Sequence, residues 1–393
     1  FKARNAGSWT TWTVSSAAAY VSGSTYTLIA RSQNGAGTYS AVYSSVVVVY
    51  DAVAPQTGIV LPANGGIVSS LPQLTGTTAD FPGINPGVVN NVRLRIKRNS
   101  DENYWNGLGG WSGTPVDLGA AQGVTVYTST FDMAGVNLPT TPDLTSGVSY
   151  YITSSGRDNA AGGGNTEAFG SPRGSTVTVD KVGPDTGFQA PLDLAVLSTL
   201  NKIRGTAVDA IAGVTAPGQI EVAIGELSPG AGCWNGLVAG GTFTLAGCPI
   251  YYPITGADRA GTRAAGVWDV NVPPLTTQYT YRVWVRASDG AIPTPNQSSA
   301  AQTSTVTFSY NTSLPGVALT APASLPAPGG NRSTAFGVSG TASETFGVAA
   351  ASVAYQEGDT GMWYDNIVGT FSSVVPVWTT TTLNGSAPNY TFT

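Results

Sequence analysis

Residues Tyr104-Trp105-Asn106-Gly107-Leu108 recur 129 positions later as Cys233-Trp234-Asn235-Gly236-Leu237. Trp363 follows at the same interval again, so three tryptophans stand on one period with no insertion between them. An unbroken period of this kind indicates tandem copies of one module. The sequence therefore predicts a chain built from repeats.

Further landmarks keep the same step and set the predicted boundaries. Asp51 opens an Asp-x-x-x-Pro segment that Asp180 repeats 129 residues later, and Asn311 opens a looser version after a further 131. We therefore expect four segments: residues 1–50, the last strands of a preceding or partner-completed unit; 51–179, a full repeat; 180–310, a full repeat with a disulfide; and 311–393, a repeat that lacks its last strands.

The composition favours β structure throughout. Fifty glycines and 25 prolines stand among abundant Thr, Ser and Val, which are turn and strand formers. Alternating segments such as residues 92–96 indicate half-buried strands. About seven short strands per repeat predict an all-β fold of tandem immunoglobulin-like antiparallel β-sandwiches. The period of 129 residues exceeds the usual size of an immunoglobulin domain, about 100 residues. We assign the additional residues to the tryptophan-bearing hairpin and the loop after it.

Charge and hydropathy exclude several classes of protein. Only 10% of residues are charged and the net charge is −5, so no basic surface is present for nucleic acid or anionic membranes. No apolar run approaches 20 residues, so we expect no transmembrane segment. There is no initiating Met and no signal peptide, and we expect the sequence to be a window from a longer exported polypeptide.

The two cysteines, Cys233 and Cys248, lie 15 residues apart in the second repeat. Two reduced thiols are the alternative, but we favour a disulfide because the rest of the sequence has an extracellular character. Closing so short a loop would contribute about 3 kcal/mol in the chain-entropy account. The other repeats have no cysteine, so this bridge is expected to be a local tie.

The ordered motifs resemble a known family. Gly205-Thr206-Ala207-Val208-Asp209, the tryptophan hairpin and the Tyr281 to Ala291 segment look like the bacterial immunoglobulin-like repeats of large exported cell-surface and adhesin-type proteins. This resemblance implies a modular, non-catalytic role in a stalk, adhesin or surface layer. The turn after each strand tyrosine departs from the usual Asp-x-Ala-Gly-Asn, for example at Asn34-Gly35-Ala36-Gly37, which weakens the case for an ion site of aspartates.

The chemistry-bearing residues predict no enzyme. The chain has no histidine, which removes Ser-His-Asp and Cys-His sites and the usual base near neutral pH. The aspartates stand at junctions and turns, where Asx-turns explain them and where oxygen ligands would also suit calcium. We favour the turn role and keep calcium as the alternative, expecting no other cofactor. The candidate calcium ligands are Asp51, Asp158, Asp180 and Asp289, and Asp80 and Asp209 also stand at junctions or turns of the repeats.

The periodic tryptophans have two interpretations. Trp105, Trp234 and Trp363, with Trp111, could form an exposed platform for sugar, or each could pack as the anchor of its own hairpin. We favour packing, within the chain or against a neighbouring subunit.

Two classes of function remain open. One is a structural filament, stalk or surface layer of the bacterial cell exterior, and the other is an adhesin that binds a glycan or a partner protein. Because residues 1–50 and 311–393 together amount to about one period, head-to-tail association between copies is also considered. A fragment of a longer protein explains the same pattern and is the favoured explanation.

Overall fold

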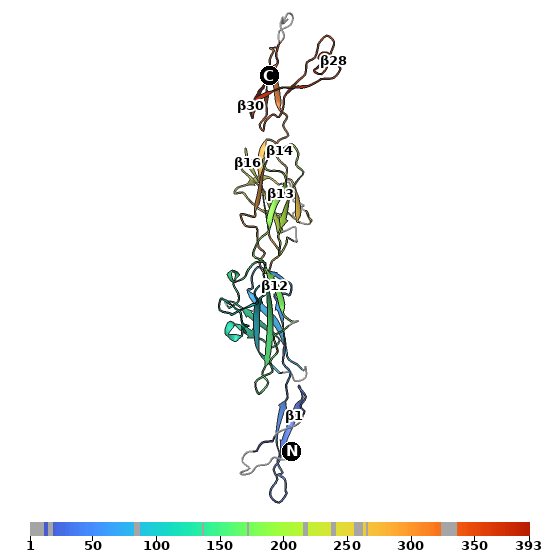
Figure 1. Ribbon diagram of the computed structural model, residues 1–393. Coiled ribbons are helices and arrows are strands. Elements are labelled where there is room, and N and C mark those ends of the chain that lie inside the picture. Colours follow the sequence, from blue (N-terminus) through green and yellow to red (C-terminus); the bar gives the residue numbers. More distant parts are fainter. Residues whose placement is uncertain are drawn as a thin grey trace. The chain divides into compact units, whose positions relative to one another are not determined.

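A computed structural model describes residues 12–14, 19–81, 87–135, 137–170, 173–214, 219–236, 241–254, 262–264, 266–323 and 336–393. Two compact units are present: Phe1–Val182 with Gly290–Asn296, and Gly183–Asp289 with Gln297–Thr393. The predicted all-β class is confirmed (Figure 1), because the described helical segments are two short 3-10 turns, η1 (Ala120–Gln122) and η2 (Thr141–Asp143). The division at residues 51, 180 and 311 stays a prediction.

The first unit contains a β-sandwich that we call the first module. One sheet has the order β3-β5-β10-β9 and the other β4-β12-β11-β6-β7-β8, with all pairs antiparallel except β12 and β4. The strands are β3 (Gln56–Leu61), β4 (Ile67–Val68), β5 (Gln73–Ala79), β6 (Val89–Arg98), β7 (Asn103–Trp105), β8 (Trp111–Ser112), β9 (Val124–Val126), β10 (Thr130–Ala134), β11 (Ser149–Asp158) and β12 (Ser175–Val179).

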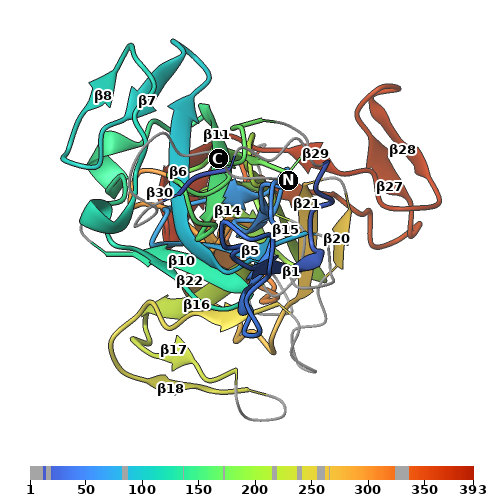
Figure 2. The same cartoon turned by 90° about the horizontal axis from the view of Figure 1, so that it is seen from below.

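The second unit contains a sandwich with the same strand order, the second module. Its sheets run β13-β15-β21-β20 and β14-β23-β22-β16-β17-β18, with β19 paired to β16. The strands are β13 (Asp185–Ala190), β14 (Ala195–Leu197), β15 (Lys202–Val208), β16 (Ile220–Ser228), β17 (Cys233–Trp234), β18 (Phe243–Leu245), β19 (Tyr252–Pro253), β20 (Thr262–Ala264), β21 (Val267–Asn271), β22 (Tyr279–Ala287) and β23 (Ser304–Tyr310). The hairpins β7–β8 and β17–β18 each project from their own module (Figure 2).

Strands also precede and follow the modules. β1 (Thr25–Ala30) pairs with β2 (Ser44–Val49) in a two-stranded sheet. After the second module, the sheet β24-β25-β31-β30 repeats the order β3-β5-β10-β9, and two further pairs are β26 with β29 and β27 with β28. These strands are β24 (Gly316–Ala321), β25 (Ser339–Ser343), β26 (Ser352–Val353), β27 (Trp363–Asp365), β28 (Thr370–Ser373), β29 (Thr379–Thr380), β30 (Leu383–Ser386) and β31 (Asn389–Phe392).

Each module encloses its own hydrophobic core. In β6 the buried and less buried positions alternate, which places Val92, Leu94 and Ile96 inside. The first core runs from Val68 to Val179 and the second from Ile203 to Phe308, as separate clusters. Burial of apolar side chains is the main stabilising contribution to a fold of this size, so each module carries that contribution itself.

The Gly-Thr landmark has a packing reason. Gly76 lies directly opposite Phe131 on the neighbouring strand, and a Cβ at Gly76 would stand 2.1 Å from that ring and 2.3 Å from the Gly58 carbonyl oxygen. Gly205 lies opposite Trp268, and a Cβ at Gly205 would stand 2.4 Å from that ring. We call this arrangement the glycine–ring pair. It recurs a third time where Gly340 faces Phe392. Only glycine leaves room for the aromatic ring to cover the strand.

Three tyrosines close the loop that precedes their strand. The Tyr150 hydroxyl accepts a hydrogen bond from the Thr145 amide at 2.9 Å, and the Tyr281 hydroxyl accepts one from the Thr276 amide at 2.7 Å. Tyr26 accepts from the Val21 amide at 2.8 Å with the same spacing of five residues. This is the tyrosine corner of immunoglobulin-type sandwiches, and both complete modules contain one.

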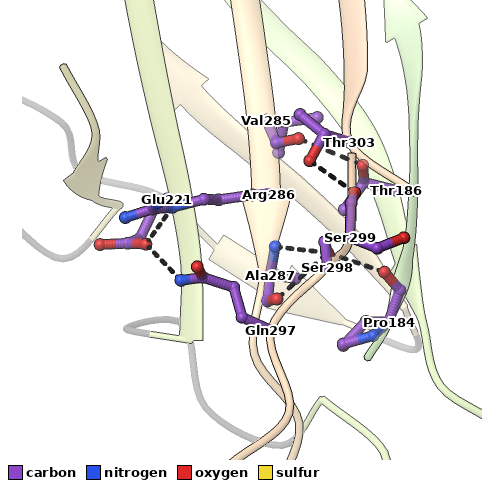
Figure 3. Close-up of polar contacts among 10 residues, drawn as sticks. All are labelled: Pro184, Thr186, Glu221, Val285, Arg286, Ala287, Gln297, Ser298, Ser299 and Thr303. Carbon is purple, nitrogen blue, oxygen red and sulfur yellow. Dashed lines mark hydrogen bonds and ion pairs between the residues drawn. The ribbon is translucent and has the colours of Figure 1, made fainter. Parts of the chain in front are cut away.

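Polar contacts join the two sheets of the second module at one edge (Figure 3). Ser298 Oγ donates to the Pro184 carbonyl at 2.7 Å and accepts the Ala287 amide at 2.9 Å. Thr186 Oγ1 donates to the Val285 carbonyl at 3.2 Å. Hydroxyl groups thus satisfy backbone groups where β13 lies beside β22, and these polar contacts help to fix this edge.

Candidate metal centre

Three aspartates of the first unit stand where strands end. Asp51 precedes β3, Asp80 directly follows β5, and Asp158 is the last residue of β11. The register of β11 shifts between Arg157 and Asp158. Such a bulge redirects the side chain that follows it, and Asp158 is 2% exposed. Residues from both sheets are therefore brought to one end of the module.

One oxygen of each carboxylate is held by local hydrogen bonds. Asp51 Oδ1 accepts from the Val53 amide at 3.1 Å and Ser22 Oγ at 3.1 Å. Asp80 Oδ1 accepts from the amide of Phe81 at 2.8 Å. These bonds to nearby amides are the turn role that the sequence predicts, since short acidic side chains commonly bind backbone amides one or two residues on.

Asp158 is held in the same manner by the loop that follows β11. Its Oδ1 accepts the amides of Ala160 at 3.0 Å and Asn165 at 2.7 Å, and its Oδ2 accepts Asn165 Nδ2 at 2.8 Å. The side chain is therefore fixed in position.

The three carboxylates converge. One carboxylate oxygen from each of Asp51, Asp80 and Asp158 lies within 4.8 Å of the other two. Asp51 Oδ2 and Asp80 Oδ2 are shielded from solvent and have no hydrogen-bond partner among the described residues. Both lie beside Gly87, where a Cβ would stand 2.4 Å from Asp80 Oδ2 and 2.8 Å from Asp51 Oδ2. We call the three residues the Asp51 cluster.

The electrostatics of the cluster are unfavourable without a counterion. Burial raises the pKa of the Asp80 carboxyl, and the negative charges of Asp51 and Asp158 raise it further, against the lowering effects of the Phe81 and Gly87 amides. No Lys or Arg among the described residues forms an ion pair with the cluster. A cavity of about 390 Å³ lined by Asn90, Asn91 and residues 157–160 reaches Asp158 from solvent.

The aspartates at the equivalent positions of the period are also turn residues. Asp180 Oδ1, in the first unit, accepts the Val182 amide at 3.1 Å. Asp209 Oδ1, in the second unit, accepts the amides of Ile211 and Gly213, both at 2.9 Å. Asp180 and Asp289 are fully buried. Asp180 and Asp209 thus have the local bonding expected of an Asx-turn.

The periodic tryptophans differ in exposure. Trp105 and Trp234 are each 1% exposed, so neither forms part of an exposed sugar platform. Trp105 Nε1 donates to the Asn137 carbonyl at 2.7 Å, and its ring meets the half-buried Trp111 edge to face. Trp363 is half-buried in β27. The first two anchor their hairpins to the core.

The predicted disulfide is present. It joins Cys233 in β17 to Cys248 beyond β18, with the Cα atoms 5.4 Å apart. The bridge therefore ties the base of the hairpin that carries Trp234, where β17 begins and the chain leaves β18.

An arginine cluster on the first module was not anticipated from the sequence. Asp117 accepts from Arg93 at 2.8 Å and from Arg95 at 2.6 Å, and the Arg95 guanidinium lies 3.9 Å from the centre of the Phe169 ring. The alternation in β6 could have indicated that both arginines share one face, but Asp117 and Phe169 come from distant loops. The charges are paired within the cluster, so it is a structural contact.

Comparisons with known proteins found no matching family model and no matching curated protein. Solved structures that are similar include the fibronectin(III)-like modules of Clostridium thermocellum CbhA, at 13% identity, 65% coverage of this chain, 94% of that chain and TM-score 0.27. The I-band fragment I67-I69 of titin has 8% identity, 86% and 87% coverage and TM-score 0.29. The FN1-FN3 domains of chicken CNTN1 have 10% identity, 68% and 71% coverage and TM-score 0.27.

Within the described residues, no helix has the length and hydropathy required to cross a bilayer.

Proposed function

We propose that this chain of tandem immunoglobulin-like modules is a non-catalytic structural protein of the bacterial cell exterior, serving in a stalk, filament or surface layer. The observation that carries this proposal is the repetition of one strand order around two separate cores. Repeated, self-contained modules extend a chain without new chemistry. The absence of histidine from the sequence supports a non-catalytic role.

The disulfide supports the proposed location. Disulfides persist in oxidising compartments such as the periplasm and the cell surface and are rare in the cytosol. The single bridge closes the hairpin of the second module, and Cys233 is buried. The low charge of the chain gives no basic face for nucleic acid.

Surface labelling tests this proposal. Antibodies against the chain are applied to intact and to permeabilised cells of the bacterium that encodes it, and the labelled material is extracted for electron microscopy and intact mass. We expect labelling of intact cells and extended or sheet-like assemblies. Labelling that requires permeabilisation would contradict the proposal.

The alternative function is an adhesin module that binds a glycan or a partner protein. It is supported by exposed apolar side chains around β27 and β28, where Ile367 is 91% exposed and Trp378 is 64% exposed. Apolar groups left exposed in this number commonly mark interaction surfaces. A glycan array probed with the wild type and with Trp378→Ala tests this function. Saturable binding that the substitution weakens supports it, and the absence of binding to any glycan on the array would exclude a glycan as the ligand.

We also propose that neighbouring copies of the same protein are its partners. Among the described strands β1 pairs with β2, and the side chains of Leu28, Ile29 and Val46–Val49 are exposed. In the two modules the corresponding strands, β11 and β22, pair on their other edge with β6 and β16. A strand of another copy that paired with β1 would complete this sheet in the way that β6 completes the sheet of β11. Sedimentation of the wild type and Val47→Glu tests this: association that the charge abolishes is expected, whereas a monomer at all concentrations contradicts it.

A further inference from the structure

We propose that the outer face of the first module binds a lysine side chain of a partner polypeptide through Asp132 and Tyr127. Both modules have an aspartate at this position of the sheet, and the second module pairs it with a lysine of its own. The site involves neither the Asp51 cluster nor the exposed side chains around β27 and β28. It does not depend on the proposed structural role.

Asp132 and Asp269 occupy equivalent positions in the two modules. Each follows the ring of its glycine–ring pair by one residue, Asp132 in β10 and Asp269 in β21. Successive side chains of a strand point to opposite faces of the sheet. Because the ring faces the core, the carboxylate lies on the outer face. In the second module Lys202 Nζ donates to Asp269 Oδ1 at 2.7 Å. An ammonium group therefore satisfies the carboxylate at this position.

The first module has glutamine where the second has this lysine. Gln73 is the first residue of β5, as Lys202 is the first residue of β15. From there a long side chain can reach the aspartate, which is its diagonal neighbour on the adjacent strand. The half-buried Asp132 side chain forms no hydrogen bond or ion pair with any residue that the structure describes. Its carboxylate is thus placed like that of Asp269 but lacks the ammonium group.

A cavity beside Asp132 leaves room for such a group. It measures about 350 Å³, and its lining includes Val60, Thr75, Thr77, Tyr127, Thr130 and Asp132. Small residues lie at its centre, because Gly58 is paired with Thr77 and Thr77 with Thr130 across three strands. Sites for small ligands commonly enclose about 300–1,000 Å³, so the cavity is large enough for one side chain.

The lining suits both parts of a lysine side chain. The Tyr127 ring is 54% exposed, and the face of such a ring attracts an ammonium group. The Asp132 carboxylate can accept a charge-assisted hydrogen bond, and the Thr75 and Thr77 hydroxyls can accept others. Val60 offers apolar surface to the alkyl stem. The net charge of −5 also favours the approach of a basic partner.

An NMR titration of the full chain tests the site. The probe is Nα-acetyl-lysine methylamide, and the norleucine analogue, which has an alkyl side chain without the charge, is the control ligand. We expect the lysine probe to shift the amide signals of β5 and β10 around Asp132. The dissociation constant should rise with the NaCl concentration, because salt screens the ion pair. Unchanged signals in these strands, or equal shifts with the norleucine analogue, would overturn the proposal.

Variants assign the binding to these side chains. Asp132→Asn and Tyr127→Ala should each raise the dissociation constant about 2- to 5-fold, as expected for contacts at a partly exposed site. Gln73→Lys supplies the cation that the second module has, so it should fill the site from within the chain and abolish binding of the probe.

The matched control is Asp185→Asn, which removes an exposed carboxylate of β13 and should bind the probe like the wild type. All four substitutions lie on solvent-facing positions, and unchanged β6 signals without the probe verify that each variant is folded. Wild-type affinity in Asp132→Asn, or in Gln73→Lys, would overturn the assignment of the ligand to Asp132.

Discussion

Trp105→Ala should destabilise the first module and leave the second unchanged. Trp105 is 1% exposed, its indole nitrogen donates to the Asn137 carbonyl at 2.7 Å, and its ring packs on Trp111. Replacement of a buried tryptophan by alanine costs about 3–5 kcal/mol. At about 1.4 kcal/mol for each factor of ten, amides that exchange only on unfolding of the module should exchange roughly 100 to several thousand times faster.

Hydrogen exchange resolves the modules, which a single melting curve of a multidomain chain does not. Peptides from β6 and β11 should show the acceleration, and peptides from β16 and β22 should keep the wild-type rate. Leu108→Ala is the matched control, because Leu108 lies in the same hairpin and is 82% exposed; it should change the free energy by no more than about 0.5 kcal/mol. A loss below about 1 kcal/mol for Trp105→Ala, or equal losses in both modules, would refute the packing role.

Three further predictions concern the second module. Gly205→Ala should destabilise the second module by about 1–3 kcal/mol or more, because the new methyl group would overlap the Trp268 ring. Thermal unfolding of this module, followed by hydrogen exchange, checks this, and a midpoint temperature equal to that of the wild type would contradict it. Reduction of the Cys233–Cys248 bridge should lower the free energy of unfolding of the second module by about 3 kcal/mol, since the bridge closes a 15-residue loop. Adding reductant should therefore shift the unfolding transition of the second module and leave that of the first module unchanged. Burial raises the pKa of the Glu226 carboxyl in the folded protein above its value in the unfolded chain. The protonated carboxyl therefore contributes stability at pH values below the pKa of the unfolded chain, and this contribution is lost as the pH rises through the pKa of the folded protein. Glu226→Gln should therefore raise stability at neutral pH and flatten this part of the pH profile, and denaturant titrations at several pH values that show the wild-type slope would argue against it.

The architecture follows from the sequence because it depends on periodic patterns. The recurrence of Trp105 at Trp234 predicts modules with the same strands, and the two modules have the same strand order. The alternating segment at residues 92–96, which the sequence marks as a half-buried strand, lies in β6. These features are local in sequence, or repeat it, and need no knowledge of which loops meet.

The candidate metal centre could be predicted only in part. Asp51, Asp80 and Asp158 were expected at junctions and turns, but their convergence depends on a bulge at the end of β11 and on Gly87, which no short motif indicates. Which oxygen of each carboxylate is unpaired depends on local hydrogen bonds in three dimensions. The spacing of these residues along the sequence does not contain that information, because Asp51, Asp80 and Asp158 are far apart in the chain.

The glycine–ring pair has a consequence for how tandem modules fold beside one another. Neighbouring copies in one newly made chain are at high local concentration, and exchange of equivalent strands is a characteristic misfolding route. The first module places a phenyl ring, Phe131, over Gly76, and the second places an indole, Trp268, over Gly205. A strand exchanged between the first and second modules would bring a ring of the wrong size, so the difference at this position favours recovery of the correct strand by each of these two modules.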